Sequence, residues 1–143
     1  MRAKQGSAYY TSSSNFFVYG GGGQKADWEG HDNHWFNNVL GFPGGLVHHN
    51  GYGGQIGSPG KGVLDGHNHI YSGNKAVLGY SKTYAKPICS GPGASVLSNN
   101  LYWTADGTGS SDCPAGFETN GTVAAFTSTM DDDLIQFARE VLW

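Results

Sequence analysis

The stretch Asp32-Asn33-His34-Trp35-Phe36 recurs with similar residues as His67-Asn68-His69-Ile70-Tyr71. Each copy is followed by a segment that begins with asparagine and ends in mostly apolar residues, 37–42 after the first copy and 74–80 after the second. Residues 14–19 and 95–103 are fainter copies. The asparagines at 15, 33 and 68 are separated by 18 and then 35 residues. Unequal spacing between similar short strands favours a solenoid with fixed strands and loops of variable length.

The alternation of side chains along a strand assigns the two faces of these repeats. One parity is apolar, and we expect it to point inward together with an asparagine ladder that satisfies its own hydrogen bonds. The expected inward residues are Phe17, Trp35 and Ile70, with Asn15, Asn33 and Asn68 as the ladder. The expected outward residues are Phe16, His34 and His69, with Val18, Phe36 and Tyr71.

The composition indicates an ordered, turn-rich, all-β chain. Glycine makes up 24 of 143 residues, and such a content disfavours long helices because each interior glycine costs about 1 kcal/mol relative to alanine. The net charge is −3 and the basic residues are scattered, so we expect no nucleic-acid partner. We expect no membrane span, because no apolar run approaches the ~20 residues required. Long loops are expected at residues 20–24, 41–62, 81–93 and 106–116.

Cys89 and Cys113 both lie in segments rich in glycine, proline and serine. A disulfide between them would suit an oxidising compartment, and two free thiols in a cytosolic protein are the alternative. Asn120 begins an Asn-Gly-Thr glycosylation sequon. Residues 1–20 show no signal peptide, and the strand-like sequence that starts near residue 9 suggests missing upstream turns. We therefore expect an extracellular or cell-surface protein that lacks its N-terminal part.

The C-terminal residues carry a helical pattern. Residues 127–129 can cap a helix, and residues 131–133 place three carboxylates near its N-terminal dipole. An apolar stripe follows at helical spacing. The sequence thus predicts β turns with long loops over residues 1–127 and a short capping helix over 128–143 that covers an open sheet edge.

With these features, the chain resembles the right-handed parallel β-helix proteins of the pectate-lyase-like superfamily. It is more narrowly similar to uncharacterised β-helix proteins predicted in microbial eukaryotes, through residues 121–128, 132–135 and 138–142 of its tail. The resemblance covers residues 14–143 and implies the fold. The superfamily contains lyases, hydrolases, epimerases and non-catalytic proteins, so the fold does not select an activity. A lectin-like β-sandwich with antiparallel pairing is the alternative fold.

Three kinds of site are conceivable. Phe36 and Tyr71, with His34 and His69, would form an outward face suited to stacking on sugar rings. His34 and His69 are also the weak candidates for a metal site, although two imidazoles at these positions are more often a surface stack.

A catalytic site is the remaining possibility. Lyases of the resembled superfamily typically use a Ca²⁺ site of carboxylates and a basic proton acceptor, for which Asp32, Asp65, Lys61 and Lys75 are the weak candidates. The absence of arginine between Arg2 and Arg139 removes a usual partner of uronates. We expect a structural or carbohydrate-binding protein whose partner is a polysaccharide or glycan. A lyase, hydrolase or epimerase and a metal-binding protein are the alternatives.

Overall fold

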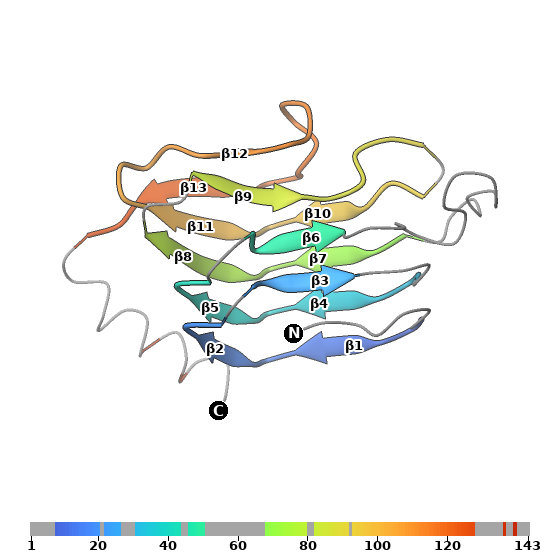
Figure 1. The fold of residues 1–143 in the computed structure, drawn as a ribbon, viewed down its shortest axis with the longest axis horizontal. Coiled ribbons are helices and arrows are strands. Elements are labelled where there is room, and N and C mark those ends of the chain that lie inside the picture. The colour runs from blue at the N-terminus through green and yellow to red at the C-terminus, as the bar shows by residue number, and fades with distance from the viewer. Residues whose placement is uncertain are drawn as a thin grey trace.

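The computed structural model describes residues 8–20, 22–26, 31–43, 46–50, 68–79, 82–91 and 93–127, together with Gln136 and Arg139. Within these residues the chain forms thirteen short strands in three parallel sheets (Figure 1). The protein is therefore all-β in this part, as the composition predicts.

The chain visits the three sheets in turn. Sheet one has the order β1-β4-β7-β10 and consists of β1 (Thr11–Ser13), β4 (His34–Phe36), β7 (Ile70–Ser72) and β10 (Val96–Ser98). Sheet two has the order β13-β11-β8-β5-β2 and consists of β2 (Phe16–Val18), β5 (Val39–Gly41), β8 (Lys75–Gly79), β11 (Leu101–Thr104) and β13 (Thr122–Ala125). Sheet three has the order β12-β9-β6-β3 and consists of β3 (Gln24–Ala26), β6 (His48–Asn50), β9 (Thr83–Lys86) and β12 (Ser110–Ser111).

Each consecutive set of three strands, one from each sheet, is called a layer below, and successive layers stack from β1 to β13 (Figure 1). A fifth layer starts where Thr119 bridges Ser98 in parallel and continues into β13. All strand pairings in the described part of the chain are parallel. The alternative antiparallel sandwich is therefore wrong for these residues.

Sheet three corrects the prediction of four long loops. Residues 20–24, 41–62, 81–93 and 106–116 each overlap a strand of this sheet. Its strands read Gln-Lys-Ala, His-His-Asn, Thr-Tyr-Ala-Lys and Ser-Ser, without the apolar alternation that marks a strand in sequence. They are strands because backbone groups of the layers above and below are available to pair with them.

The corner between sheets one and two uses the same backbone conformation in several layers. The residues with positive φ at this corner are Ser14 (54°), Asn37 (52°), Gly73 (62°), Asn99 (55°) and Asn120 (54°). Asparagine and glycine tolerate this left-handed conformation better than other residues do. Glycine is also needed at 73 for space, since a Cβ there would lie 2.6 Å from the side-chain oxygen of Asn37.

In the first four layers, the residue after the left-handed position is an asparagine, and these asparagines form a ladder. The Oδ1 atom of Asn38 accepts hydrogen bonds from the backbone N–H and Nδ2 of Asn15, at 3.1 and 2.9 Å. Asn74 accepts the same pair from Asn38, at 3.1 and 3.2 Å, and Asn100 accepts it from Asn74, at 2.9 Å each. The polar groups at this corner are thereby satisfied from layer to layer.

The predicted ladder of Asn15, Asn33 and Asn68 is wrong in two of its members. Asn33 does point inward and is fully buried, but its Oδ1 accepts the backbone N–H of Tyr10 at a different corner. Asn68 is half-buried and precedes β7 by two residues, so it does not occupy the ladder position.

The interior is filled by side chains from all three sheets. The parity that points inward from sheet two contains Phe17, Leu40, Ala76, Tyr102 and Val123, which contact one another across the strands. In sheet one the inward column is Trp35, Tyr71 and Leu97. The rings of Trp35 and Tyr71 stack with centroids 4.8 Å apart.

The predicted alignment of the repeats is therefore wrong by one residue. Trp35 pairs with Tyr71 rather than with Ile70, and Phe17 belongs to sheet two rather than to the column of Trp35. His69 and Tyr71 were predicted to face outward, but both are fully buried. A shift of one residue in a strand moves each side chain to the opposite face.

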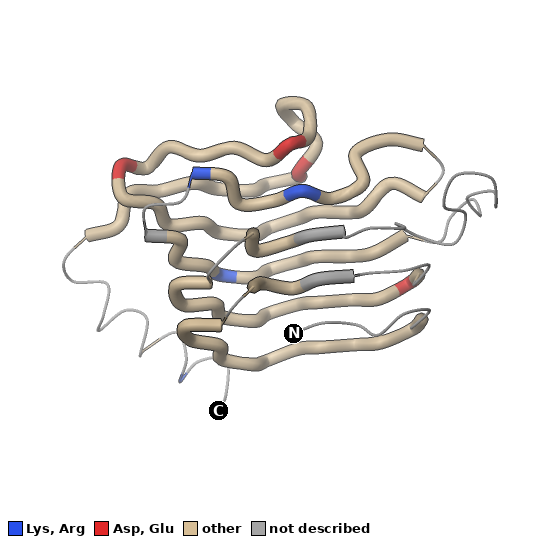
Figure 2. Tube along the Cα trace, viewed as in Figure 1, with Lys and Arg blue, Asp and Glu red and all other residues tan. Residues whose placement is uncertain are grey.

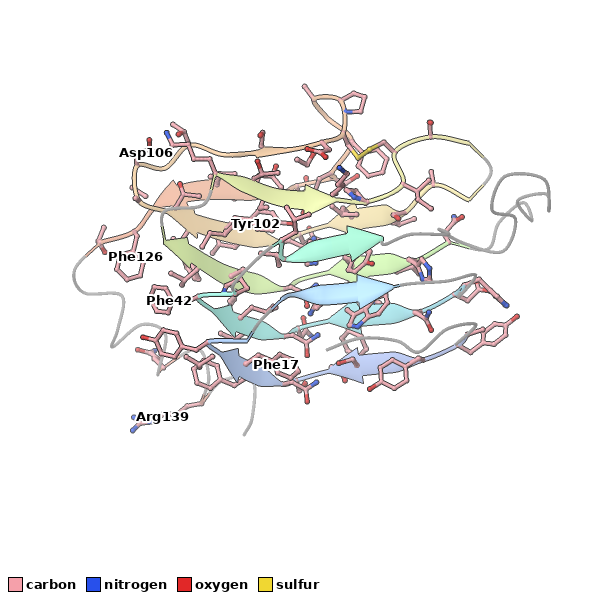
Figure 3. All side chains as sticks on the ribbon, viewed as in Figure 1. Phe17, Phe42, Tyr102, Asp106, Phe126 and Arg139 are labelled. Atoms are coloured by element: carbon pink, nitrogen blue, oxygen red, sulfur yellow. A yellow bond between two sulfur atoms is a disulfide. The ribbon has the colours of Figure 1, made fainter. Side chains whose placement is uncertain are left out.

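The opposite face of sheet two is also apolar. Val39 and Val77 are fully buried there and Trp103 is nearly so. Phe42 and Phe126 lie on this side of the stack, with ring centroids 6.3 Å apart (Figure 3). The predicted C-terminal helix, 128–143, lies outside the described residues except for Gln136 and Arg139, which have helical backbone. The described residues contain no helix with the length and hydropathy of a membrane span.

Candidate functional site

Two of the four residues predicted to bind carbohydrate lie on the outward face of sheet one. His34 and Phe36 are both partly exposed on β4, with ring centroids 4.6 Å apart. His34 Nε2 lies 2.9 Å from Ser72 Oγ, within hydrogen-bonding distance. Partial burial lowers the pKa of His34. On the neighbouring strand β7, the residues paired with His34 and Phe36 are Ile70 and Ser72 rather than the predicted His69 and Tyr71.

The other two predicted residues are inside the protein. His69 packs at a tilt against Trp35, with ring centroids 5.8 Å apart, and Tyr71 stacks on the same Trp35 ring. Neither side chain is presented to a ligand on the surface, and His69 does not share the outer face of His34. Within the described ranges, no group of three or more histidine, cysteine or acidic residues is placed to hold a metal ion.

The two weak catalytic candidates that the structure describes, Asp32 and Lys75, lie beside strands of different sheets. Asp32 lies at a corner before β4 with a φ of 51°, and its carboxylate is 2.6 Å from His31 Nδ1. Lys75 begins β8 in sheet two. Lys61 and Asp65 lie outside the described residues. Figure 2 shows that the charged residues of the described part are sparse along the sheets, and that several gather in the loops around β9 and β12.

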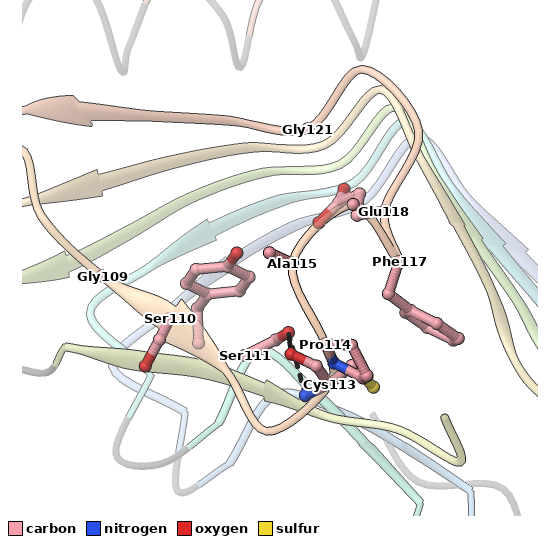
Figure 4. A pocket seen from close by; sticks show the side chains of 11 residues that line it. Gly109, Ser110, Ser111, Cys113, Pro114, Ala115, Phe117, Glu118 and Gly121 are labelled. Atoms are coloured by element: carbon pink, nitrogen blue, oxygen red, sulfur yellow. Dashed lines mark hydrogen bonds between the residues drawn. The ribbon is translucent and has the colours of Figure 1, made fainter. Parts of the chain in front are cut away.

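A pocket that the sequence did not indicate lies beside these loops, at the β12–β13 end of the stack (Figure 4). Its volume is about 370 Å³. Its described lining residues are Tyr84, Gly109, Ser110, Ser111, Cys113, Pro114, Ala115, Gly116, Phe117, Glu118 and Gly121. The described lining thus combines two aromatic residues, Tyr84 and Phe117, with two serine hydroxyls and one carboxylate.

Glu118 is held in this pocket by the end of the asparagine ladder. Its Oε1 accepts hydrogen bonds from Asn100 Nδ2 at 2.7 Å and from the Asn100 backbone N–H at 3.3 Å. The Tyr102 hydroxyl donates to Oε2 at 3.2 Å. In the register of sheet two, Gly121 holds the position that Asn100 holds in the layer before, because each immediately precedes its strand.

Gly121 has no side chain to continue the ladder, and Glu118 occupies the space instead. A Cβ built on Gly121 would lie 2.5 Å from Glu118 Cδ and 2.8 Å from its Oε2. The carboxylate therefore replaces the amide that a fifth ladder asparagine would supply. It accepts the same two donors from Asn100 that each ladder amide accepts from the layer before it.

Burial dominates the electrostatics of the site. It raises the pKa of Glu118, against the opposing effect of hydrogen bonds from Asn100 and Tyr102. It also raises the pKa of Tyr102 well above 10, with a further contribution from the Glu118 charge. The pKa of Tyr84 is raised by burial and by Glu118, and a hydrogen bond with Ser111 opposes this. Both tyrosines are therefore neutral hydroxyl groups near neutral pH, and their rings stack with centroids 3.9 Å apart.

The loop that carries Glu118 is fixed at several points. The predicted disulfide between Cys89 and Cys113 is confirmed, with the two Cα atoms 5.3 Å apart. The backbone N–H of Cys113 donates to Ser111 Oγ at 3.2 Å (Figure 4). Phe117 packs against the core column of sheet one. The glycosylation candidate, Asn120, is exposed in the turn that follows.

Comparison of the chain with protein-family models, with curated proteins and with solved structures found no match.

Proposed function

We propose that this protein is a right-handed parallel β-helix protein of the pectate-lyase-like type that acts outside the cell or at its surface by binding carbohydrate. Three parallel sheets visited in turn, with an asparagine ladder at one corner, support the fold assignment. The disulfide supports an oxidising compartment.

The observation that carries the binding role is the pocket around Tyr84 and Glu118. Its volume of about 370 Å³ falls in the range of small-ligand pockets, roughly 300–1,000 Å³. A sugar ring has an apolar C–H face and a rim of hydroxyl groups, so it suits an aromatic ring beside hydroxyl and carboxylate groups. Tyr84 supplies the ring, and Ser110, Ser111 and Glu118 supply polar partners.

Binding is favoured over hydrolysis by the number of acidic groups. Glycoside hydrolysis commonly requires two carboxylates that flank the scissile bond. The described lining of the pocket has one, Glu118. Asp112 is on the same loop but does not line the pocket, and its carboxylate is 3.5 Å from Lys86 Nζ.

The test is calorimetric titration of the protein with a panel of neutral, amino and uronate oligosaccharides. Tyr84→Leu keeps apolar bulk in the core and removes the aromatic ring, so we expect it to abolish measurable binding. Phe36→Leu removes an aromatic ring from the outward face of sheet one and is the matched control. The proposal fails if no saccharide binds to folded protein, and the assignment to this pocket fails if Phe36→Leu abolishes binding while Tyr84→Leu does not.

A further inference from the structure

We infer that the pocket selects sugars that carry a protonated amino group over neutral sugars and uronates of the same length, an inference that rests on the carbohydrate-binding role proposed above. The charge distribution around Glu118 carries it.

The described lining of the pocket has a negative group, Glu118, and no positive one. Glu118 is the charged member of the described lining, which contains neither lysine nor arginine. The lysines that flank Tyr84 along β9 are matched by other carboxylates, because Lys82 Nζ contacts Asp106 and Lys86 Nζ lies 3.5 Å from Asp112. A uronate in the pocket would therefore meet a carboxylate of the same sign without a cation to offset the repulsion.

Glu118 retains hydrogen-bonding capacity toward the pocket. A carboxylate offers about four acceptor positions on its two oxygens. Two of the donors that reach Oε1 come from Asn100, whereas the described contact of Oε2 is one hydroxyl at 3.2 Å. An ammonium group that donates to Oε2 would form a charge-assisted bond, which is stronger than a bond between neutral groups.

The partial burial of Glu118 increases the effect. A half-buried carboxylate is less screened by salt and water than a surface one, so its attraction for a cation persists at physiological ionic strength. A nearby ammonium would also favour the ionised form of Glu118, offsetting the rise of its pKa by burial. The exposed hydroxyl of Ser110 lines the pocket and can bond the neutral part of the sugar, whereas Ser111 Oγ already accepts the Cys113 N–H.

The experiment compares three tetrasaccharides by calorimetry: the glucosamine tetramer, the N-acetylglucosamine tetramer and tetragalacturonate, at a pH at which the free amine is protonated. We expect the wild-type protein to bind the glucosamine tetramer about tenfold more tightly than its acetylated counterpart, with uronate weakest. Glu118→Gln keeps an oxygen acceptor for Asn100 and removes the charge, so we expect it to reduce the two glucosamine-type affinities to within about twofold of each other.

Asp32→Asn is the charge-matched control, because it also removes one carboxylate, at a left-handed position that asparagine tolerates and outside the pocket lining. It is expected to retain the tenfold preference. If Glu118→Gln keeps the preference, or if uronate binds most tightly, the selectivity is refuted while the carbohydrate-binding role stands. If none of the tetramers nor the wider panel binds, the binding role itself fails and the selectivity fails with it.

Discussion

Replacement of His48 by leucine is expected to make the protein more resistant to acid. The His48 side chain lies entirely inside the stack, between Tyr71 and Tyr102, with ring centroids at 4.8 and 5.7 Å. Among the described residues, neither ring nitrogen of His48 has a hydrogen-bond partner. Burial therefore disfavours the charged imidazolium and lowers the pKa of His48 to about 3.

The magnitude follows from the difference between the folded and unfolded chains. An exposed histidine has a pKa of about 6.5, so below that pH the unfolded chain binds a proton that folded His48 does not bind. The free energy of unfolding then falls by up to about 1.4 kcal/mol per pH unit, from about pH 6.5 down to the folded-state pKa near 3. Between about pH 7.5 and pH 5 this loss is about 2 kcal/mol. His48→Leu removes it, together with two unpartnered polar atoms.

Urea unfolding followed by tryptophan fluorescence and far-ultraviolet circular dichroism measures the effect. The difference between variant and wild type should grow by about 2 kcal/mol on going from about pH 7.5 to 5, or roughly 1 M in the urea midpoint. His34→Leu, at a partly exposed position, is the control and should leave most of the acid sensitivity in place. Parallel loss of stability in wild type and His48→Leu would refute the reasoning, because it would mean that the imidazole is hydrated or bonded in the folded protein.

Three further experiments test the ladder and the loop. Asn74→Ala should lower the free energy of unfolding by at least about 2 kcal/mol more than Asn15→Ala does. Asn74 is buried and hydrogen-bonds to the asparagines of the layers before and after it. Urea titration of both variants measures the difference. Replacement of both Cys89 and Cys113 by alanine should cost roughly 3–4 kcal/mol, since the bond closes a sequence separation of 24 residues, and the comparison with intact protein is made without reductant. Gly121→Asn should lower the melting temperature, because a Cβ there would overlap the carboxylate that ends the ladder, and an unchanged melting temperature would contradict that overlap.

The sequence was sufficient to predict an all-β chain and the disulfide between Cys89 and Cys113. It also indicated an asparagine ladder, but of the predicted members only Asn15 belongs to it. It was not sufficient for the register. The similar segments around His34 and His69 predict a repeat of 35 residues, whereas the ladder asparagines 38 and 74 are 36 residues apart. The better marker was local: Asn37-Asn38, Gly73-Asn74 and Asn99-Asn100 each place a left-handed residue before a ladder asparagine.

The third sheet could not be predicted from residue patterns for a physical reason. A half-buried strand shows alternation only where one of its faces has to be apolar. In β3 and β6 the inward positions are the fully buried Gln24 and His48, so polar residues stand where the pattern requires apolar ones. Gln24 is tied into the ladder by a 3.0 Å bond from its Nε2 to Asn74 Oδ1. That bond spans 50 residues of sequence and exists only once the layers are stacked.

The pocket lies at the layer where the asparagine ladder ends. An interior amide such as that of Asn74 accepts from the layer before it and donates to the layer after it, so little of its bonding capacity is left for a ligand. At the last layer, Gly121 has no side chain, and the carboxylate of Glu118 accepts the donors of Asn100 from one side only. Because a carboxylate cannot donate, it cannot extend the ladder, and its remaining acceptor capacity faces the pocket. The replacement of a fifth ladder asparagine by Gly121 and Glu118 thus ends the ladder, and it also places a charged, partly buried carboxylate where it can bind a ligand.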